Sequence, residues 1–167
     1  MKRHIFTTCV VFALATSAAG VMAAENPQQQ IQALYNRISQ ALADKDVDAI
    51  MATRAEGYQS YKSNGKLNKD GKEVERKYFD GVFARATTIR DNVVVLSFTP
   101  DGKDVIVLSK ESYTRTQQDR ARGLVLSVHV VSTSRDFWVK GDGSWLLKRS
   151  RDINAKVTKT LNGKVMP

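Results

Sequence analysis

The apolar pattern of this 167-residue chain changes its period once, near Arg85, and this change limits the fold more than any other feature. Before Arg85, apolar residues recur every three or four positions, which is the spacing of an amphipathic helix. After Arg85, they alternate with polar residues over long runs, as in half-buried strands. Helices followed by consecutive strands predict an α+β domain in which the helices lie across one face of an antiparallel sheet.

The first half predicts three helices and one short strand. The first helix begins at Pro27, because the first turn of a helix does not need the N–H that proline lacks. Its apolar positions are Ile31, Leu34, Tyr35, Ile38, Ala41 and Leu42. Asp46 is predicted to cap a short second helix that ends before Gly57. Residues 57–62 alternate and predict a short strand.

The third helix is predicted to begin at Asp70, which together with Glu73 resembles a capping box. A turn is expected just before it, over residues 63–66. The side of this helix that faces the core is predicted to carry Val74, Tyr78, Val82 and Phe83.

The second half predicts four long strands, over residues 87–99, 103–115, 121–140 and 144–157. The last two form a hairpin, because Gly141-Asp142-Gly143 supplies residues that tolerate the positive φ of short connections. Trp138 and Trp145 lie on either side of this turn and are predicted to be buried. Strict alternation then places Trp145, Leu147 and Arg149 on one face of the sheet.

Residues 1–24 have the pattern of a signal peptide: a basic start, an apolar stretch and small residues at the end. The sequence therefore predicts an exported protein, periplasmic or secreted, with no stable membrane insertion after cleavage. Its domain is expected to span residues 25–158, followed by a loosely held tail at 159–167. Cys9, the only cysteine, lies in the signal peptide, so the exported chain would have no disulfide, thiol nucleophile or cysteine-ligated metal.

The formal net charge of the whole chain is +9. Lysine and arginine are interleaved with aspartate and glutamate, and no run of five basic residues occurs. A nucleic-acid partner is therefore not expected, and most of the charge is interpreted as a solvated surface.

Three segments resemble the NTF2-like superfamily, and in particular its secreted SnoaL-like and DUF4440-type branches. They are Gln40-Ala41-Leu42-Ala43-Asp44-Lys45-Asp46-Val47-Asp48-Ala49-Ile50, then Gly57-Tyr58, and finally the hairpin from Trp138 to Leu147. The resemblance covers about residues 28–157. It implies a cystatin-like cone in which three helices pack on a curved antiparallel sheet and enclose a pocket. It also implies a possible homodimer formed through the sheet.

The same resemblance does not extend to the catalytic residues of the ketosteroid isomerases in this superfamily. Aligning residues 46–50 with that branch of the superfamily puts Ile38 at the position of its helix tyrosine. Lys62, or a neighbour in the 58–62 strand, falls at the position of its carboxylate base. An isoleucine cannot donate a hydrogen bond to an enolate, and a lysine replaces a carboxylate base only after a large fall in its pKa. An isomerase of this type is therefore disfavoured.

Six residues are candidates for the pocket, namely Tyr35, Tyr58, Tyr61, His129, Trp145 and Arg149. The resemblance places the three tyrosines around the pocket, where they could bind a ligand or simply pack in the core. His129 could act as a general acid or be a satisfied strand histidine, and one histidine alone does not form a zinc site. Arg149, like Arg151, Asp136 and Asp152, is expected near the pocket mouth, either to pair with a carboxylate ligand or to form surface salt bridges.

The NTF2-like fold hosts isomerases, hydrolases, cyclases and binding modules, so the fold alone does not assign an activity. No catalytic residue, metal site or cofactor is predicted. We expect a non-enzymatic module that binds a small hydrophobic or anionic ligand, or a partner protein. The alternative is a SnoaL-like enzyme that acts on a small hydrophobic substrate, with His129 and Tyr58 in acid–base roles.

Overall fold

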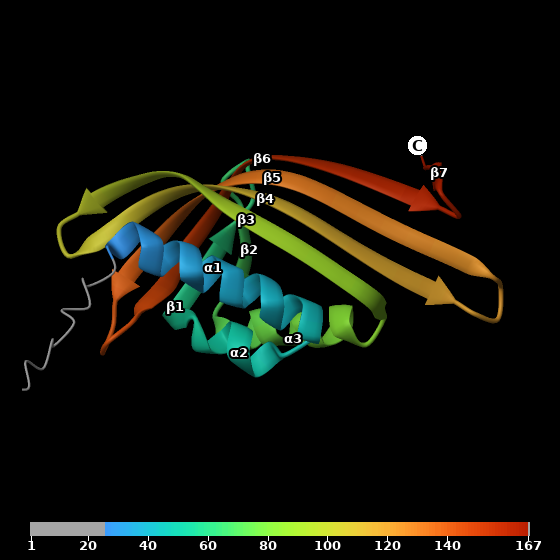
Figure 1. The fold of residues 1–167 in the computed structure, drawn as a ribbon, viewed down its shortest axis with the longest axis horizontal. Helices are drawn as coiled ribbons and strands as arrows, with labels where there is room; N and C mark the ends of the chain where they lie inside the picture. Colours follow the sequence, from blue (N-terminus) through green and yellow to red (C-terminus); the bar gives the residue numbers. More distant parts are fainter. Residues whose placement is uncertain (1–25, 167) are drawn as a thin grey trace, which may run out of the picture.

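Three helices pack against one face of a strongly curved sheet in the computed structural model, which describes residues 26–166 (Figure 1). The predicted signal peptide lies outside the described residues. The helices are α1 (Pro27–Asp44), α2 (Val47–Ala52) and α3 (Lys72–Phe83). The strands are β1 (Arg54–Tyr61), β2 (Leu67–Asp70), β3 (Ala86–Asp101), β4 (Asp104–Asp119), β5 (Leu124–Lys140), β6 (Trp145–Leu161) and β7 (Lys164–Val165).

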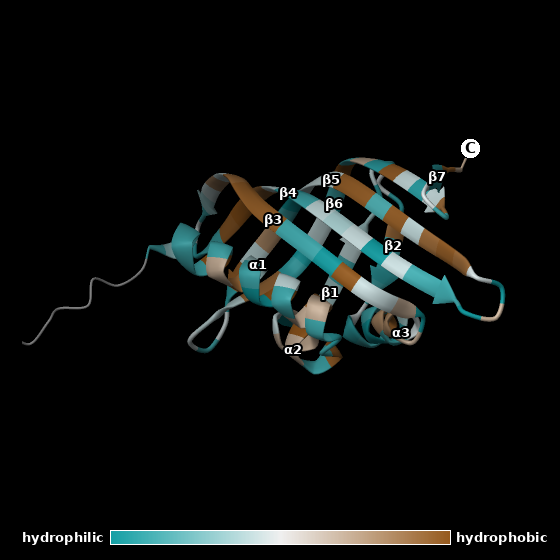
Figure 2. Ribbon diagram, turned by 45° about the vertical axis from the view of Figure 1, so that its right-hand side comes forward, coloured by the Kyte–Doolittle hydropathy of each residue, from teal (hydrophilic) through white to brown (hydrophobic). Residues whose placement is uncertain are grey.

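The sheet has the strand order β2-β1-β6-β5-β4-β3, and β7 pairs with the end of β6. Among the strands of residues 26–166, only β1 and β6 run parallel to each other, and all other neighbouring strands are antiparallel. The long strands β4, β5 and β6 extend past the helices at one end (Figure 1). Bands of hydrophobic and hydrophilic residues follow one another along these strands (Figure 2). The predicted α+β class and helix–sheet layering are therefore confirmed.

Helix α1 forms as its sequence pattern predicts. Asn26 accepts a hydrogen bond from the Gln29 backbone N–H (2.9 Å), and the Gln29 side chain accepts one from the Asn26 N–H (3.3 Å), which completes a capping box. All six apolar positions predicted to face the core are buried. Asp46 caps α2 as predicted, because its side chain accepts a hydrogen bond from the Ala49 N–H (2.9 Å).

The start of α3 differs from the prediction. Gly71, with φ 90°, occupies the N-cap position and provides no side-chain cap. Asp70 instead ends β2, a strand that was not predicted and that follows the expected turn at residues 63–66, and its carboxylate accepts a hydrogen bond from Gln59 Nε2 (2.9 Å). Val74 and Tyr78 are half exposed, whereas Val82 is buried as expected.

Both tryptophans of the closing hairpin are buried, as predicted. Trp138 is 0% exposed in the centre of the core. Trp145 lies against α1, where its Nε1 donates to Gln30 Oε1 (3.0 Å). Strand β6 continues to Leu161 and β7 folds back onto it, so the first part of the predicted tail pairs within the sheet.

The curvature of the sheet coincides with extra residues in its long strands. In β6, Lys148 is unmatched between the pairs Trp138–Leu147 and Phe137–Arg149, and Ile153 is unmatched between Ser134–Asp152 and Thr133–Asn154. Leu96 is unmatched in the same way in β3. Such β-bulges bend a strand, and the residues after the bulge point to the opposite faces from those that strict alternation would give them. No helix formed by residues 26–166 is long and apolar enough to cross a membrane.

Candidate functional site

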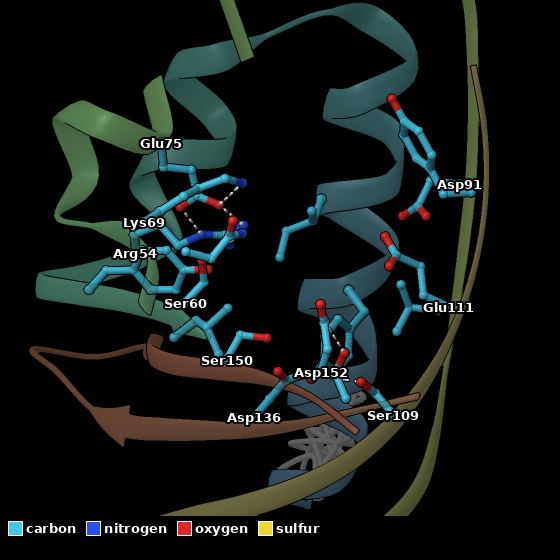
Figure 3. Close-up of a pocket in the computed structure, with 18 of the residues that line it drawn as sticks. Arg54, Ser60, Lys69, Glu75, Asp91, Ser109, Glu111, Asp136, Ser150 and Asp152 are labelled. Carbon is cyan, nitrogen blue, oxygen red and sulfur yellow. Dashed lines mark hydrogen bonds and ion pairs between the residues drawn. The ribbon is translucent and has the colours of Figure 1, made fainter. Parts of the chain in front are cut away.

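A cavity of about 310 Å³ lies between the helices and the concave face of the sheet. Five carboxylic residues and two basic residues contribute to its lining, alongside several aromatic rings (Figure 3). The carboxylic residues are Glu75, Asp91, Glu111, Asp136 and Asp152, and the basic residues are Arg54 and Lys69. Figure 3 shows the two basic residues beside Glu75 on one side of the cavity, with Asp91 and Glu111 on the opposite side.

Asp136 lies at the base of the cavity and is only 3% exposed. Its Oδ2 accepts hydrogen bonds from Tyr35 Oη (2.5 Å) and Ser109 Oγ (2.9 Å). The Tyr35 oxygen in turn accepts one from Trp138 Nε1 (3.1 Å), and the two rings meet edge to face. Asp136 Oδ1 is buried and makes no hydrogen bond. One carboxylate oxygen is therefore fixed by the protein, while the other has no partner.

Burial raises the pKa of Asp136, although the nearby Ser150 hydroxyl and the two hydroxyls that bond to Oδ2 counteract this effect. Burial also raises the pKa of Tyr35 well above its ordinary value, and the neighbouring Asp136 adds to the shift. The Tyr35 phenol consequently stays protonated and acts as a hydrogen-bond donor to Asp136 at physiological pH.

A buried ion pair joins β1 to α3 on the opposite side of the cavity. Arg54 Nε lies 3.0 Å from Glu75 Oε2, and Arg54 Nη1 donates to Thr53 Oγ1 (2.8 Å). Lys69 Nζ lies 3.9 Å from Glu75 Oε1 and 3.9 Å from the centre of the Tyr78 ring. Burial lowers the pKa of Lys69, while Glu75 opposes that change. Glu75 is thus the anion shared by both basic residues of the cavity.

Asp91 and Glu111 face each other diagonally on neighbouring strands, since Glu111 pairs with Val93, two residues from Asp91. Ser39 Oγ donates to Asp91 Oδ2 (2.7 Å), and Ser132 Oγ donates to Glu111 Oε2 (3.0 Å). Asp91 Oδ1 is buried without a hydrogen-bond partner. Burial and the adjacent Asp91 charge raise the pKa of Glu111 to about 7, and burial also raises that of Asp91. Glu111 is therefore partly protonated near neutral pH.

Three of the six predicted pocket residues line the cavity, namely Tyr35, Tyr58 and Tyr61. Tyr58 is 3% exposed, and burial raises its pKa. Tyr61 is half-buried and donates to Gln59 Oε1 (2.8 Å). Ile38 also lines the cavity, so the phenol on α1 comes from Tyr35, one turn earlier than the alignment had suggested.

The other three predicted pocket residues lie elsewhere. His129 is exposed, with Nε2 3.4 Å from Ser112 Oγ, because its neighbour Val130 takes the inward position on β5. Trp145 packs beneath α1 instead of lining the cavity. The structure therefore does not place His129 in the cavity, where the suggested acid–base role requires it.

Arg149 points outward, with its guanidinium 5.1 Å from the centre of the Phe137 ring. The bulge at Lys148 explains this correction, because the inward positions after it are Ser150 and Asp152. Arg149 is exposed and cannot pair with a carboxylate ligand inside the cavity.

Sequence reasoning missed most of the charged lining, and placed Asp136 at the pocket mouth instead of its base. One signal could have located Asp136. It precedes the buried Trp138 by two residues on the same strand, so the alternation that buries Trp138 also directs Asp136 inward.

Comparisons with known proteins identify the fold but no specific activity. No family model matches this sequence. No curated protein matches it either. An NTF2-like protein of unknown function from Pseudomonas putida has 15% sequence identity and a TM-score of 0.57, and the alignment covers 75% of this chain and 84% of that chain.

Two further solved structures have similar folds. A domain of unknown function with a cystatin-like fold from Nostoc punctiforme has 14% identity and a TM-score of 0.56, with 75% of each chain covered. A type 2 hexachlorocyclohexane dehydrochlorinase has 11% identity and a TM-score of 0.63, with 84% of this chain and 93% of that chain covered. These likenesses, together with the three helices on a curved sheet, show that this chain has the cystatin-like fold of NTF2-like proteins.

Proposed function

We propose that this protein binds a small molecule in the cavity and that Asp136 is the main polar contact. The observation that carries the proposal is the buried Oδ1 of Asp136, which has no hydrogen-bond partner although Oδ2 accepts two hydrogen bonds. Leaving a buried carboxylate oxygen unpaired is unfavourable, so a ligand that donates a hydrogen bond there gains that unused interaction.

The size and lining of the cavity support this proposal. Its volume of about 310 Å³ lies at the lower end of the range for small-molecule sites. The rings of Tyr58, Tyr113 and Phe79 offer apolar contact surface. The carboxylic lining favours a ligand with hydrogen-bond donors over the hydrophobic or anionic ligand expected from sequence. Export, the homodimer and a protein partner stay predictions.

Substitution of Asp136 by asparagine tests the role of its free oxygen. Both protein donors bind Oδ2, so the asparagine carbonyl can keep the bonds from Tyr35 and Ser109 while its NH₂ group faces the cavity. We expect compounds from a library of small amines, alcohols and amides to raise the melting temperature of the wild-type protein and to lose this effect in Asp136→Asn. A ligand present at 100 times its Kd should stabilise the wild type by about 2.7 kcal/mol.

Asp142→Asn provides the matched control, because Asp142 is exposed in the hairpin turn. This control should keep every ligand-induced shift. If the shifts persist unchanged in Asp136→Asn, or if no compound in the library shifts the wild type, small-molecule binding through Asp136 is rejected.

An enzyme using proton transfer is the second candidate, and the observation that favours it is Glu111. A carboxyl group with a pKa of about 7 on a cavity wall can both donate and accept a proton at neutral pH. We expect Glu111→Gln, which can keep the hydrogen bond from Ser132, to abolish any turnover of small substrates that lose water or hydrogen halide. Equal turnover by the wild type and Glu111→Gln would exclude this role.

A further inference from the structure

We propose that the small molecule carries a protonated amine, which binds between Asp136 at the base of the cavity and Asp91 and Glu111 on its wall. This inference rests on the proposed small-molecule function and specifies the chemical class of the ligand. The three carboxylic residues are called the acidic side of the cavity below.

The charges in the cavity are unevenly distributed. On one side, Arg54 and Lys69 both lie within salt-bridge distance of Glu75, so that side has two basic groups for one carboxylate and does not need another cation. On the acidic side, none of the three carboxyls forms a salt bridge with any residue in the described part of the chain. Partial protonation of Glu111 lowers the negative charge of this side, but the charge that remains has no counterion there, and a positively charged group would supply one.

Two separate oxygen atoms of the acidic side are buried without a hydrogen-bond partner, Asp136 Oδ1 and Asp91 Oδ1. The other oxygen of each carboxyl is held in place by a protein hydroxyl. A hydroxyl ligand has one hydrogen to donate, whereas a primary ammonium has three and also supplies the missing positive charge. An ammonium group therefore matches both the geometry and the charge of the acidic side.

The cavity already contains one ammonium group bound in a related way. Lys69 Nζ lies 3.9 Å from the centre of the Tyr78 ring and 5.2 Å from that of Phe79, in addition to its contact with Glu75. This arrangement combines a carboxylate with aromatic faces, which attract cations. Tyr113 and Tyr35, which also line the cavity, add two further aromatic residues to its wall.

Isothermal titration calorimetry with matched probes tests the proposal on the full chain. The probes are phenethylamine, its neutral analogue 2-phenylethanol and its anionic analogue phenylacetate, with benzylamine and tyramine as amines of other sizes. We expect at least one amine to bind about tenfold more tightly than both the alcohol and the acid. Asp136→Asn and Asp91→Asn should each weaken that amine about tenfold, whereas 2-phenylethanol, which has one donor and no charge, should lose less affinity in each variant.

Both substitutions are designed to keep the fold, since the asparagine carbonyl can still accept the bonds from Tyr35 and Ser109, or from Ser39. Should one variant fail to fold, the other gives the same test. The exposed Asp142→Asn is the control and should bind the amine as the wild type does.

The inference is overturned if the alcohol or the acid binds as tightly as every amine, if no amine binds, or if amine binding is unchanged in both variants. Binding of the alcohol or the acid that is lost in Asp136→Asn would reject the amine while preserving small-molecule binding. Absence of binding by all five probes and by the wider compound library would reject both proposals.

Discussion

Replacing Tyr35 by phenylalanine should destabilise the protein more than the loss of a single hydrogen bond. The Tyr35 hydroxyl donates to Asp136 Oδ2 (2.5 Å) and accepts from Trp138 Nε1 (3.1 Å). Loss of a hydrogen bond to a charged group costs about 1.5–3 kcal/mol. The Trp138 indole N–H is also left without an acceptor at a site that is 0% exposed, at a further cost of about 1–3 kcal/mol.

Together these contributions predict that Tyr35→Phe lowers the free energy of unfolding by about 2.5–6 kcal/mol, a large part of the 5–15 kcal/mol typical of a domain. Urea unfolding followed by circular dichroism and tryptophan fluorescence measures this loss. Tyr61→Phe is the matched control, because its hydroxyl bonds only to Gln59 Oε1 in a half-buried position. The control should lose less than about 1 kcal/mol.

A loss below about 1 kcal/mol for Tyr35→Phe, with an unchanged dependence on urea concentration, would refute this reasoning. It would mean that water reaches the groups around Asp136 and replaces the phenol. A control variant that is as unstable as Tyr35→Phe would refute it too, because the cost would then not depend on burial.

The geometry of the site leads to three other predictions. Arg54→Met leaves Glu75 buried without its main partner and should lower the free energy of unfolding in urea by about 3–5 kcal/mol. A decrease of less than about 1 kcal/mol would contradict this prediction. The pKa of Glu111 is raised from its ordinary value of 4.5 to about 7 in the native state. Between these two pH values the native state binds more protons than the unfolded state, so the free energy of unfolding should fall by about 3 kcal/mol as the pH rises from 4.5 to about 7. Glu111→Gln should flatten that fall, and equal pH profiles would disprove the assignment. His129→Ala and Arg149→Ala should leave ligand affinity unchanged, since neither side chain lines the cavity, and a tenfold loss in either variant would contradict the placement.

Local periodicity was sufficient to predict the three helices and the four long strands in their order along the chain. The apolar positions of α1 were all identified, because a long amphipathic pattern with a clear N-cap leaves little choice of face. The start of α3 was misjudged because Asp70 pairs with Gln59 of β1 and so belongs to β2. The local sequence pattern does not reveal a contact of this kind between separate strands. Pairing partners compete with capping signals, and here the sheet determines the outcome.

The acidic side of the cavity could not be predicted, because it depends on strand register. Near the turn between β3 and β4, Ser97 pairs with Leu108; beyond the extra residue Leu96, Val95 pairs with Ser109. Continuing the first register would place Val94 opposite Glu111 and direct Asp91 to the other face. The bulge therefore brings Asp91 and Glu111 into one cavity, and no alternation rule applied to either strand alone contains that information.

The bulge at Lys148 also has a consequence for how the gene can change. Loss of the codon for Lys148 would leave Leu147 opposite Trp138 and Arg149 opposite Phe137, so every residue of β6 would keep its present face. Loss of the codon for Arg151 would instead set Asp152 opposite Arg135, on the outer surface. Insertions and deletions in this strand should therefore be tolerated during evolution at Lys148, where the length of the chain can vary without reversing the wall of the cavity.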